Sequence, residues 1–233
     1  MNPNKFYSVV VPVYNEEENV PLLIKAIDDV LKNYQYELVL VDDFSTDKTV
    51  KVVKNLAHPN VVLIELKKNY GQSSALMAGI DYAKGDYIIT MDGDMQNDPT
   101  DIPMMVEKMD EDECDLVIGK RQKRQDNLLR TFPSKVANFI IRRTTKLNVK
   151  DHGCALKVFN KDTAKGLDLY GESHRFITLH AHIAGARISE VPVKHHARQF
   201  GVSKYGIGRT TKVVNDLILL LFIALFVFIN TKY

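Results

Sequence analysis

Residues 37–66 read ELVLVDDFSTDKTVKVVKNLAHPNVVLIEL, and this stretch decides the expected fold. It starts and ends with runs rich in Val, Leu and Ile, each of the length of a β-strand. The intervening residues 46–57 are typical of a helix. A strand, a helix and another strand form the unit that joins parallel strands, so the stretch predicts part of a parallel sheet.

The same alternation continues along the chain on both sides of this unit. The expected strands are residues 6–14, 37–43, 61–66, 86–92, 115–120, 155–159 and 187–195. The expected helices are residues 19–34, 46–57, 72–83, 99–109 and 175–186. No repeat or Pro/Gly-rich linker divides the chain. We therefore expect one α/β domain, a Rossmann-like and mainly parallel sheet with helices on both faces.

Charge is distributed unevenly along the 233 residues, although the net charge is only +2. Residues 1–118 contain 22 acidic and 10 basic residues, whereas residues 119–233 contain 7 acidic and 21 basic ones. All nine arginines lie in the second part. Because the planar guanidinium binds phosphate through two hydrogen bonds, this asymmetry indicates a second half that receives an anion. Two solvated faces of opposite sign are the simpler alternative.

Three further features restrict the class of protein. Cys114 and Cys154 are too few for a disulfide framework and too isolated for a zinc site, and both are expected to be core residues. The N-terminus lacks the pattern of a secretory signal, which predicts a cytoplasmic location. Residues 217–229, LILLLFIALFVFI, are apolar but shorter than a bilayer-spanning helix. That segment is expected to lie at a membrane interface, to pair with another subunit, to begin a truncated spanning helix, or to be a buried terminal helix.

Carboxylates follow one of the predicted strands directly, in IITMDGDMQNDP at residues 88–99. Asp92 and Asp94 are separated only by a glycine, so their side chains can converge on one hard cation such as Mg²⁺ or Mn²⁺. The alternative for this cluster is a helix cap, which explains Asp98 before Pro99 better than it explains the pair. Ligands of parallel sheets bind at the carboxyl ends of strands, where Glu16 and Asp42 are also expected.

Two common nucleotide-binding motifs are missing. A dinucleotide-binding enzyme would carry G-x-G-x-x-G after its first strand, and a P-loop protein would carry G-x-x-x-x-G-K-S/T. The chain contains neither at the expected place.

Several longer motifs together resemble those of glycosyltransferase family 2 enzymes with the GT-A fold. They are VVVPVYNEEENV, LVLVDDFSTDKT and NYGQSSALMAGIDYAKGDYIITMDGDMQNDP. In the second half, VIGKRQKR, DHGCALKVF, SHRF and ARQFGVSKYGIGR are similar to dolichyl-phosphate mannose synthases and bacterial polyprenyl-phosphate glycosyltransferases. The resemblance implies a GT-A domain at residues 1–210, with a nucleotide-sugar half (1–118) and an acceptor half (119–210). Residues 211–233 would form a membrane-associated or truncated transmembrane helix.

The resemblance also implies a set of residues that bind the donor. Those expected around the base and ribose are Pro12, Tyr14, Glu16 and Asp42. The residues expected to hold the metal against the diphosphate are Asp92, Asp94 and Gln96. Those expected to close over the donor phosphates are Arg198, Ser203 and Lys204.

On the acceptor side, the lipid phosphate is expected to bind Arg121, Arg130 and Ser134. Asp151 of DHGC is expected to position or deprotonate the acceptor, which with Asp94 completes the predicted catalytic pair. Phe44 departs from the family pattern, which commonly has Gly at this place, so the turn beside the base is expected to differ.

The expected reaction is transfer of a hexose from a nucleotide sugar to a polyprenyl phosphate, with inversion, at the cytoplasmic membrane face. UDP-glucose is the favoured donor and GDP-mannose the alternative. A phosphate monoester is largely dianionic at neutral pH, so this acceptor needs no strong base. The alternative is a soluble family 2 enzyme that acts on a saccharide or protein hydroxyl. Nucleic acid is not expected as a partner, and homo-oligomer formation is left open.

Overall fold

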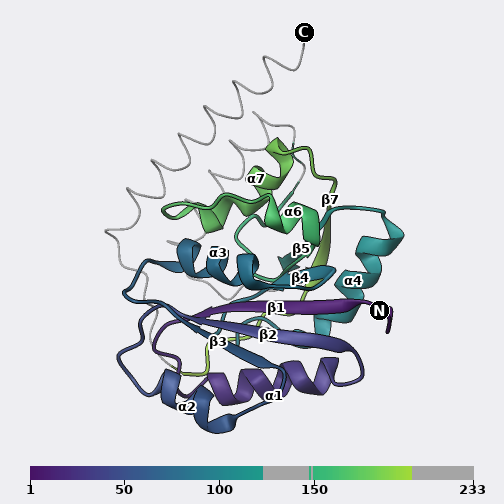
Figure 1. Cartoon of the computed structure of the whole chain (residues 1–233). Coiled ribbons are helices and arrows are strands. Elements are labelled where there is room, and N and C mark those ends of the chain that lie inside the picture. The colour runs from purple at the N-terminus through teal and green to yellow at the C-terminus, as the bar shows by residue number, and fades with distance from the viewer. Residues whose placement is uncertain (123–146, 148, 201–233) are drawn as a thin grey trace.

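The structure is a computed structural model that describes residues 1–122, 147 and 149–200 (Figure 1). In these residues seven strands form one sheet in the order β3-β2-β1-β4-β6-β5-β7. The strands are β1 (Phe6–Val13), β2 (Gln35–Asp42), β3 (Val61–Glu65), β4 (Tyr87–Thr90), β5 (Leu116–Arg121), β6 (Lys157–Asn160) and β7 (Ile188–Val193). The predictions for the basic segment beyond residue 122 and for the C-terminal helix lie outside the described residues.

The helices lie where the sequence pattern predicts them, with small shifts at their ends. They are α1 (Val20–Leu31), α2 (Thr49–Leu56), α3 (Gln72–Tyr82), η1 (Pro99–Asp101), α4 (Ile102–Glu111), α6 (Lys161–Lys165), η2 (Ser173–Phe176) and α7 (Ile177–Ile183). Helix α2 begins three residues later than expected. A carboxylate oxygen of Asp47 accepts hydrogen bonds from the backbone N and the hydroxyl of Thr49, which fixes the preceding residues as a turn. The short helix α6 was not predicted.

The sheet is mainly parallel, as expected, but β6 runs against its neighbours. Strand β1 pairs in parallel with β2 and β4, and β5 pairs in parallel with β7. Strand β6 is antiparallel to both β4 and β5. Its first residue, Lys157, lies opposite Thr90 at the end of β4 and opposite Ile118 of β5. The segment that leads into β6 therefore reaches the edge at which β4 and β5 end.

The sheet has an apolar core on each face, and β1 contributes to both. Val9 and Val11 belong to the core that includes α1 and α4, whereas Val10 belongs to the core that includes α3, α6 and α7. Figure 1 shows α1 and α2 on one side of the sheet and α3, α6 and α7 on the other. Alternate side chains of a strand point to opposite faces, so an all-apolar strand is buried only if both faces are covered.

Helix α3 packs closely on the central strands because Gly79 has no side chain. A Cβ atom at this position would lie 2.4 Å from Cγ1 of Val10 and 2.9 Å from Cγ2 of Val41. These distances are shorter than contacts between carbon atoms allow. The glycine thus lets α3 lie against β1 and β2, with its N-terminus at the edge where these strands end.

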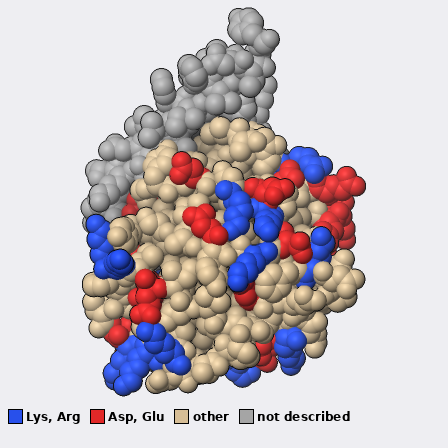
Figure 2. All heavy atoms as spheres, in the orientation of Figure 1, with Lys and Arg blue, Asp and Glu red and all other residues tan. Residues whose placement is uncertain are grey.

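The surface shows no single sign of charge on the face drawn in Figure 2. Basic and acidic side chains are interspersed there, although the two halves of the sequence have opposite charge. In the described part of the chain, no helix has both the length and the apolar character needed to span a bilayer.

Candidate active site

Polar side chains collect beyond the ends of β1, β2 and β4, at one edge of the sheet. Val13 at the end of β1 is paired with Asp42 at the end of β2. Asp92 and Asp94 follow β4, whose pairing with β1 brings its end to the same edge. Asp42 and Asp94 are buried, with exposed fractions of 2% and 7%. The sequence prediction that these carboxylates share one edge is confirmed.

The two aspartates after β4 are each held by a different partner. Oδ1 of Asp92 accepts a hydrogen bond of 2.8 Å from Nε2 of Gln72, at the start of α3. Oδ1 of Asp94 accepts one of 3.1 Å from the backbone N of Gln96. Oδ2 of Asp94 lies 2.5 Å from Nη2 of Arg198, 104 residues along the chain. Arg198 thus supplies one of the positive charges that compensate this crowded pair.

The electrostatics of the pair favour the binding of a cation. Burial, together with the neighbouring Asp94 carboxylate, raises the pKa of Asp92 to about 6, against the opposing charges of Lys157, Arg121 and Arg198. Burial also raises the pKa of Asp94, and the charge of Arg198 opposes this effect. It is costly to ionise two neighbouring buried carboxylates together. A cation bound between them would stabilise their ionised form.

The carboxylate oxygens at this edge are suitable ligands for a divalent cation that a nucleotide would help to hold. Carboxylate oxygens are the ligands that Mg²⁺ and Mn²⁺ prefer, and such ions are often bound by one or two carboxylates plus substrate phosphates. Among the described residues, no three His, Cys, Asp or Glu side chains converge as a complete metal site. Gln96, the third predicted ligand, donates its side-chain Nε2 to the backbone O of His196 at 3.3 Å. The structure therefore places the two aspartates together, while the Gln96 amide contacts His196.

A segment at residues 195–198 is fastened to the loop that carries the aspartates. The backbone N of His196 donates to the O of Gln96 at 2.9 Å, and Asn97 forms an antiparallel bridge with His195. Nε2 of His196 also lies 3.0 Å from Oδ2 of Asp98. These contacts bring Arg198 to Asp94.

Asp98 has the capping role that the sequence indicates. Its Oδ1 accepts hydrogen bonds from the backbone N and the hydroxyl of Thr100, at 3.0 and 2.7 Å. Burial alone would raise the pKa of Asp98, but the hydrogen bonds from Thr100 and His196 and the charge of Lys194 hold it at about 2. Asp98 is therefore an ionised helix cap that also binds the 194–196 segment.

At the end of β2, the adjacent Asp42 and Asp43 have different hydrogen-bond partners. Both carboxylate oxygens of Asp43 accept backbone hydrogen bonds, from Tyr70 at 2.7 Å and Gly71 at 2.9 Å. These two hydrogen bonds fix the loop that precedes α3. Asp42 uses Oδ2 to accept from the backbone N of Ser45 at 2.9 Å, and its buried Oδ1 has no hydrogen-bond partner in the part of the chain that the structure describes. A buried acceptor without a partner is costly, so a ligand N–H at Oδ1 would be favourable.

The other residues predicted for the nucleotide lie at the same edge. Pro12 is paired with Val41 near the end of β1, and Tyr14 follows directly and is half-buried. Glu16 is buried, and one of its carboxylate oxygens accepts a hydrogen bond of 2.6 Å from Nδ2 of Asn19.

Arg121 and Asp151, which the sequence predicts for the acceptor, form a two-point ion pair. Nε of Arg121 lies 2.8 Å from Oδ2 of Asp151, and Nη2 lies 2.8 Å from Oδ1. The two side chains are only 12% and 10% exposed. Oε1 of Glu190 accepts hydrogen bonds of 2.8 Å from the backbone N–H groups of Lys150 and Asp151. These bonds fix the backbone that carries Asp151. The structure thus brings together two residues that the sequence predicted separately.

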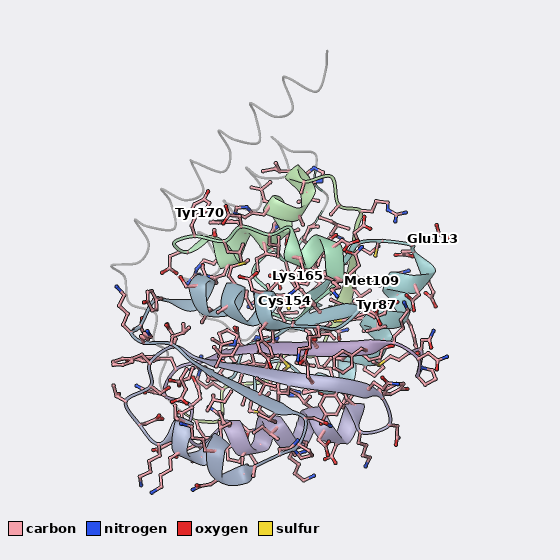
Figure 3. The ribbon with its side chains drawn as sticks, viewed as in Figure 1. Tyr87, Met109, Glu113, Cys154, Lys165 and Tyr170 are labelled. Atoms are coloured by element: carbon pink, nitrogen blue, oxygen red, sulfur yellow. The ribbon has the colours of Figure 1, made fainter. Side chains whose placement is uncertain are left out.

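A buried lysine behind this edge was not predicted. Lys157 is 2% exposed, and its Nζ donates to the backbone O of Cys154. Burial lowers the pKa of Lys157, opposed by Cys154, Asp151 and Asp92. Cys154, labelled within the molecule in Figure 3, is buried and free, as is Cys114, which confirms both as core residues. The only sequence signal for Lys157 is a charge inside an apolar strand.

The start of α3 supplies two more residues that sequence reasoning missed. Gln72 binds Asp92, and Oγ of the buried Ser73 lies 2.9 Å from Nδ1 of His174 on η2. Both are the first residues of this helix and belong to the NYGQSS motif, which was the available signal. Helix α3 therefore connects the aspartates to the second half of the chain.

Four predicted residues lie outside the described part of the chain: Ser203, Lys204, Arg130 and Ser134. A hollow of about 560 Å³ lies elsewhere, beside the start of β4, and its lining includes Tyr87, Met109 and Glu113 (Figure 3). Two carboxylates of its lining are engaged by Tyr87 and Arg187. The residues predicted for catalysis are absent from its lining, so we place the candidate site at the carboxyl edge.

Comparison with known proteins identifies the family of this chain. The family model described as Glycosyl transferase family 2 matches residues 8–167. Over 225 residues the chain is 46% identical to dodecaprenyl-phosphate galacturonate synthase of Rhizobium johnstonii, covering 92% of this chain and 66% of that protein. Over 221 residues it is 40% identical to undecaprenyl-phosphate 4-deoxy-4-formamido-L-arabinose transferase of Edwardsiella ictaluri, covering 92% and 67%. The chain thus spans about two thirds of the length of these curated relatives.

Solved structures with the same fold include glucosyl-3-phosphoglycerate synthase from Mycobacterium tuberculosis in complex with Mn²⁺ and UDP-glucose. It superposes with a TM-score of 0.73 at 16% identity, over 94% of this chain and 79% of that one. This likeness shows a GT-A fold. With the family match and the relatives above, it establishes that the chain belongs to glycosyl transferase family 2, in the group that includes the polyprenyl-phosphate glycosyltransferases.

Proposed function

We propose that this chain transfers a sugar from a nucleotide sugar to the phosphate of a polyprenyl phosphate, with inversion at the anomeric carbon. The names of the two relatives at 46% and 40% identity support this acceptor class. The paired Asp92 and Asp94 support a nucleoside diphosphate leaving group, because carboxylates beside a nucleotide commonly bind it through a divalent ion.

The observation that carries the choice of acceptor is the ion pair of Arg121 with Asp151. Both oxygens of Asp151 are bound by the guanidinium at 2.8 Å. An ionised carboxylate in such a pair is a weak base, so it is poorly suited to remove a proton from a hydroxyl. A phosphate dianion needs no such base. Asp151 therefore positions Arg121, and Arg121 binds the acceptor phosphate.

The proposed step is a single displacement that needs no proton transfer. A phosphate oxygen of the acceptor forms a bond with the anomeric carbon of the sugar. The bond from that carbon to the diphosphate oxygen breaks, and its electron pair leaves with the nucleoside diphosphate. Arg198, which lies at Asp94 in the structure, is near enough to the aspartates to stabilise this negative charge.

Asp92 and Asp94 would hold a divalent cation, Mg²⁺ or Mn²⁺, which when bound would help to neutralise the leaving diphosphate. Gln72 orients Asp92 for this role, and the backbone N of Gln96 orients Asp94. We propose that the Gln96 side chain does not bind the cation directly. It holds the backbone of His196 beside the aspartates.

The donor that fits Asp42 best is a uridine nucleotide. Oδ2 of Asp42 already accepts a hydrogen bond from the N–H of Ser45, so Oδ1 is the oxygen left to accept a further one. Uracil offers a single ring N–H, whereas the corresponding edge of guanine offers two donors that suit a carboxylate with both oxygens available. We therefore propose a UDP-sugar over GDP-mannose, with UDP-glucose as the first donor to test. The relatives' names add two sugars, galacturonate and 4-deoxy-4-formamido-L-arabinose, which should be tested next as UDP-linked donors.

We place the reaction at the cytoplasmic face of the membrane, where a polyprenyl chain would present its phosphate. In this proposal residues 1–210 form the catalytic domain. Residues 211–233, together with the basic residues beyond Arg121, associate with the membrane surface.

The test is an assay of the purified protein with Mg²⁺ or Mn²⁺, a panel of nucleotide sugars and a short polyprenyl phosphate. A glycolipid product that depends on the phosphate is the expected result. Transfer to a hydroxyl acceptor, with no product on the phosphate, would contradict it. Asp94→Ala should abolish both transfer and metal-dependent UDP binding, while the matched control Asp29→Ala, on an exposed helix surface, should change neither.

A second measurement tests the absence of a general base. The rate should rise with the second ionisation of the acceptor phosphate, near pH 6, both in the wild type and in Asp151→Asn. Asp151→Asn is expected to weaken acceptor binding. If the rise with pH disappears in this variant, Asp151 acts as the base.

A further inference from the structure

Phe44 combines two unfavourable features at the carboxyl end of β2. Its φ angle is +68°, in the left-handed region that costs an L-residue roughly 1–2 kcal/mol. Its side chain is 50% exposed, although phenylalanine is a large apolar residue. An exposed phenylalanine alone is ordinary. A bulky residue held in a conformation that favours glycine, at the edge where ligands bind, calls for a reason in function.

The turn that carries Phe44 is fixed from both sides. Before it, the carboxylate of Asp43 binds two backbone N–H groups in the loop that leads to α3. After it, the backbone N of Ser45 donates to Oδ2 of Asp42 at 2.9 Å, and Oγ of Ser45 accepts from the backbone N of Asn15 at 2.8 Å. The surrounding hydrogen bonds therefore maintain the left-handed conformation, and they hold the Cα of Phe44 in one place.

The carboxylate that closes this turn also carries an acceptor whose hydrogen bonding is incomplete. Oδ1 of Asp42 is buried and has no hydrogen-bond partner within the described ranges. A nucleobase offers an N–H donor at its edge and an apolar, aromatic face. An acceptor and an exposed aromatic ring, two residues apart on one fixed turn, match these two features.

We propose that Phe44 is a specificity-determining residue that packs its ring against the base of the donor nucleotide, while Oδ1 of Asp42 accepts the base N–H. This inference rests on the proposed function in taking a uridine nucleotide as the donor. The ring gives the chain a contact that a glycine at this position lacks.

The contribution of the ring can be separated from that of the diphosphate. Stacking of a base on an aromatic side chain is worth roughly 5- to 150-fold in affinity. In the presence of Mn²⁺, Phe44→Gly should lower the affinity for UDP by at least fivefold and leave that for pyrophosphate, which lacks a base, unchanged. Phe44→Tyr should retain UDP binding. Both affinities are measured by calorimetric titration of the full chain.

The stability of the variant gives an independent readout. Gly adopts a positive φ without strain, so Phe44→Gly should unfold at a Tm no lower than the wild type. A matched control is Tyr82→Leu, because Tyr82 is an exposed aromatic residue at the far end of α3 and should not affect UDP binding.

Three results would overturn the inference. One is unchanged UDP affinity in Phe44→Gly. Another is an equal loss of affinity for UDP and pyrophosphate, which would mean that the substitution distorts the site. The third is a wild type that binds UDP no more tightly than pyrophosphate in the presence of Mn²⁺. In that case the proposed role of Phe44 is wrong, but the metal site remains supported. If it binds neither ligand, the proposed function fails first.

Discussion

Nη2 of Arg198 lies 2.5 Å from Oδ2 of Asp94, in an ion pair whose side chains are 21% and 10% exposed. The guanidinium thus stands beside one of the two carboxylates that we propose as metal ligands. A divalent cation at Asp94 would compete with this charge, whereas a nucleoside diphosphate would attract it. Arg198 is therefore expected to have opposite effects on the binding of the metal alone and of the metal with its nucleotide.

Arg198→Gln should tighten the binding of Mn²⁺ alone and weaken the binding of UDP in the presence of Mn²⁺. Each change should be about tenfold, because one partly buried charge is removed. Titration of Mn²⁺ by electron paramagnetic resonance, with and without UDP, measures both. The control Arg187→Gln removes an exposed guanidinium paired with Asp115, and it should leave both affinities unchanged. A loss of Mn²⁺ binding in Arg198→Gln would show that the arginine supports the metal site.

Gln72→Leu should weaken the binding of Mn²⁺ with UDP by about 10- to 100-fold, the usual effect of losing a residue that orients a metal ligand. The reason is the hydrogen bond of 2.8 Å from Gln72 to Asp92. Ser74→Ala, on the exposed side of the same helix, is the control and should bind as the wild type does. Equal affinities in all three proteins would mean that Asp92 is oriented by other contacts.

Asp98→Asn should lower the free energy of unfolding by about 2 kcal/mol at pH 7, the size of its pKa depression converted to energy. Asparagine caps a helix about as well as aspartate, so the loss reports the charge. The pKa of Asp98 is lowered to about 2 in the folded chain, so its contribution exists above about pH 4 and is lost as the pH falls through 2. Urea unfolding at pH 7 and at pH 3 should show the difference shrinking. A constant difference would contradict the role of the ionised carboxylate.

Gly79→Ala should destabilise the fold by roughly 1–3 kcal/mol, although alanine favours helices by about 1 kcal/mol. The added Cβ would lie 2.4 Å from Cγ1 of Val10, a stiff and buried side chain, so the helix or the strand must shift. The double variant Val10→Ala with Gly79→Ala should be more stable than the sum of the two single effects predicts. Chemical unfolding of all four proteins measures this coupling. Strict additivity would show that the helix adjusts elsewhere.

Much of the fold followed from the sequence because its signals are local. The alternation of apolar strands with amphipathic helices predicted the elements from β1 to β5 with small errors at their ends. The placement of Asp92 and Asp94 directly after a strand predicted the edge at which they lie. Asp98 before Pro99 predicted its cap for the same reason, since capping depends on residues only two positions apart.

The tertiary structure alone decided which distant residues meet. The strand β6 runs antiparallel between β4 and β5, and this orientation brings Asp151 to Arg121 and the charge of Lys157 within the influence of Asp92. The contact of Asp94 with Arg198 joins residues 104 positions apart. The choice between parallel and antiparallel pairing for one short apolar strand depends on register and packing across the whole sheet, which no local pattern encodes. The sequence determined the chemistry available at the sheet edge, and the order and direction of the strands determined which charges are paired there.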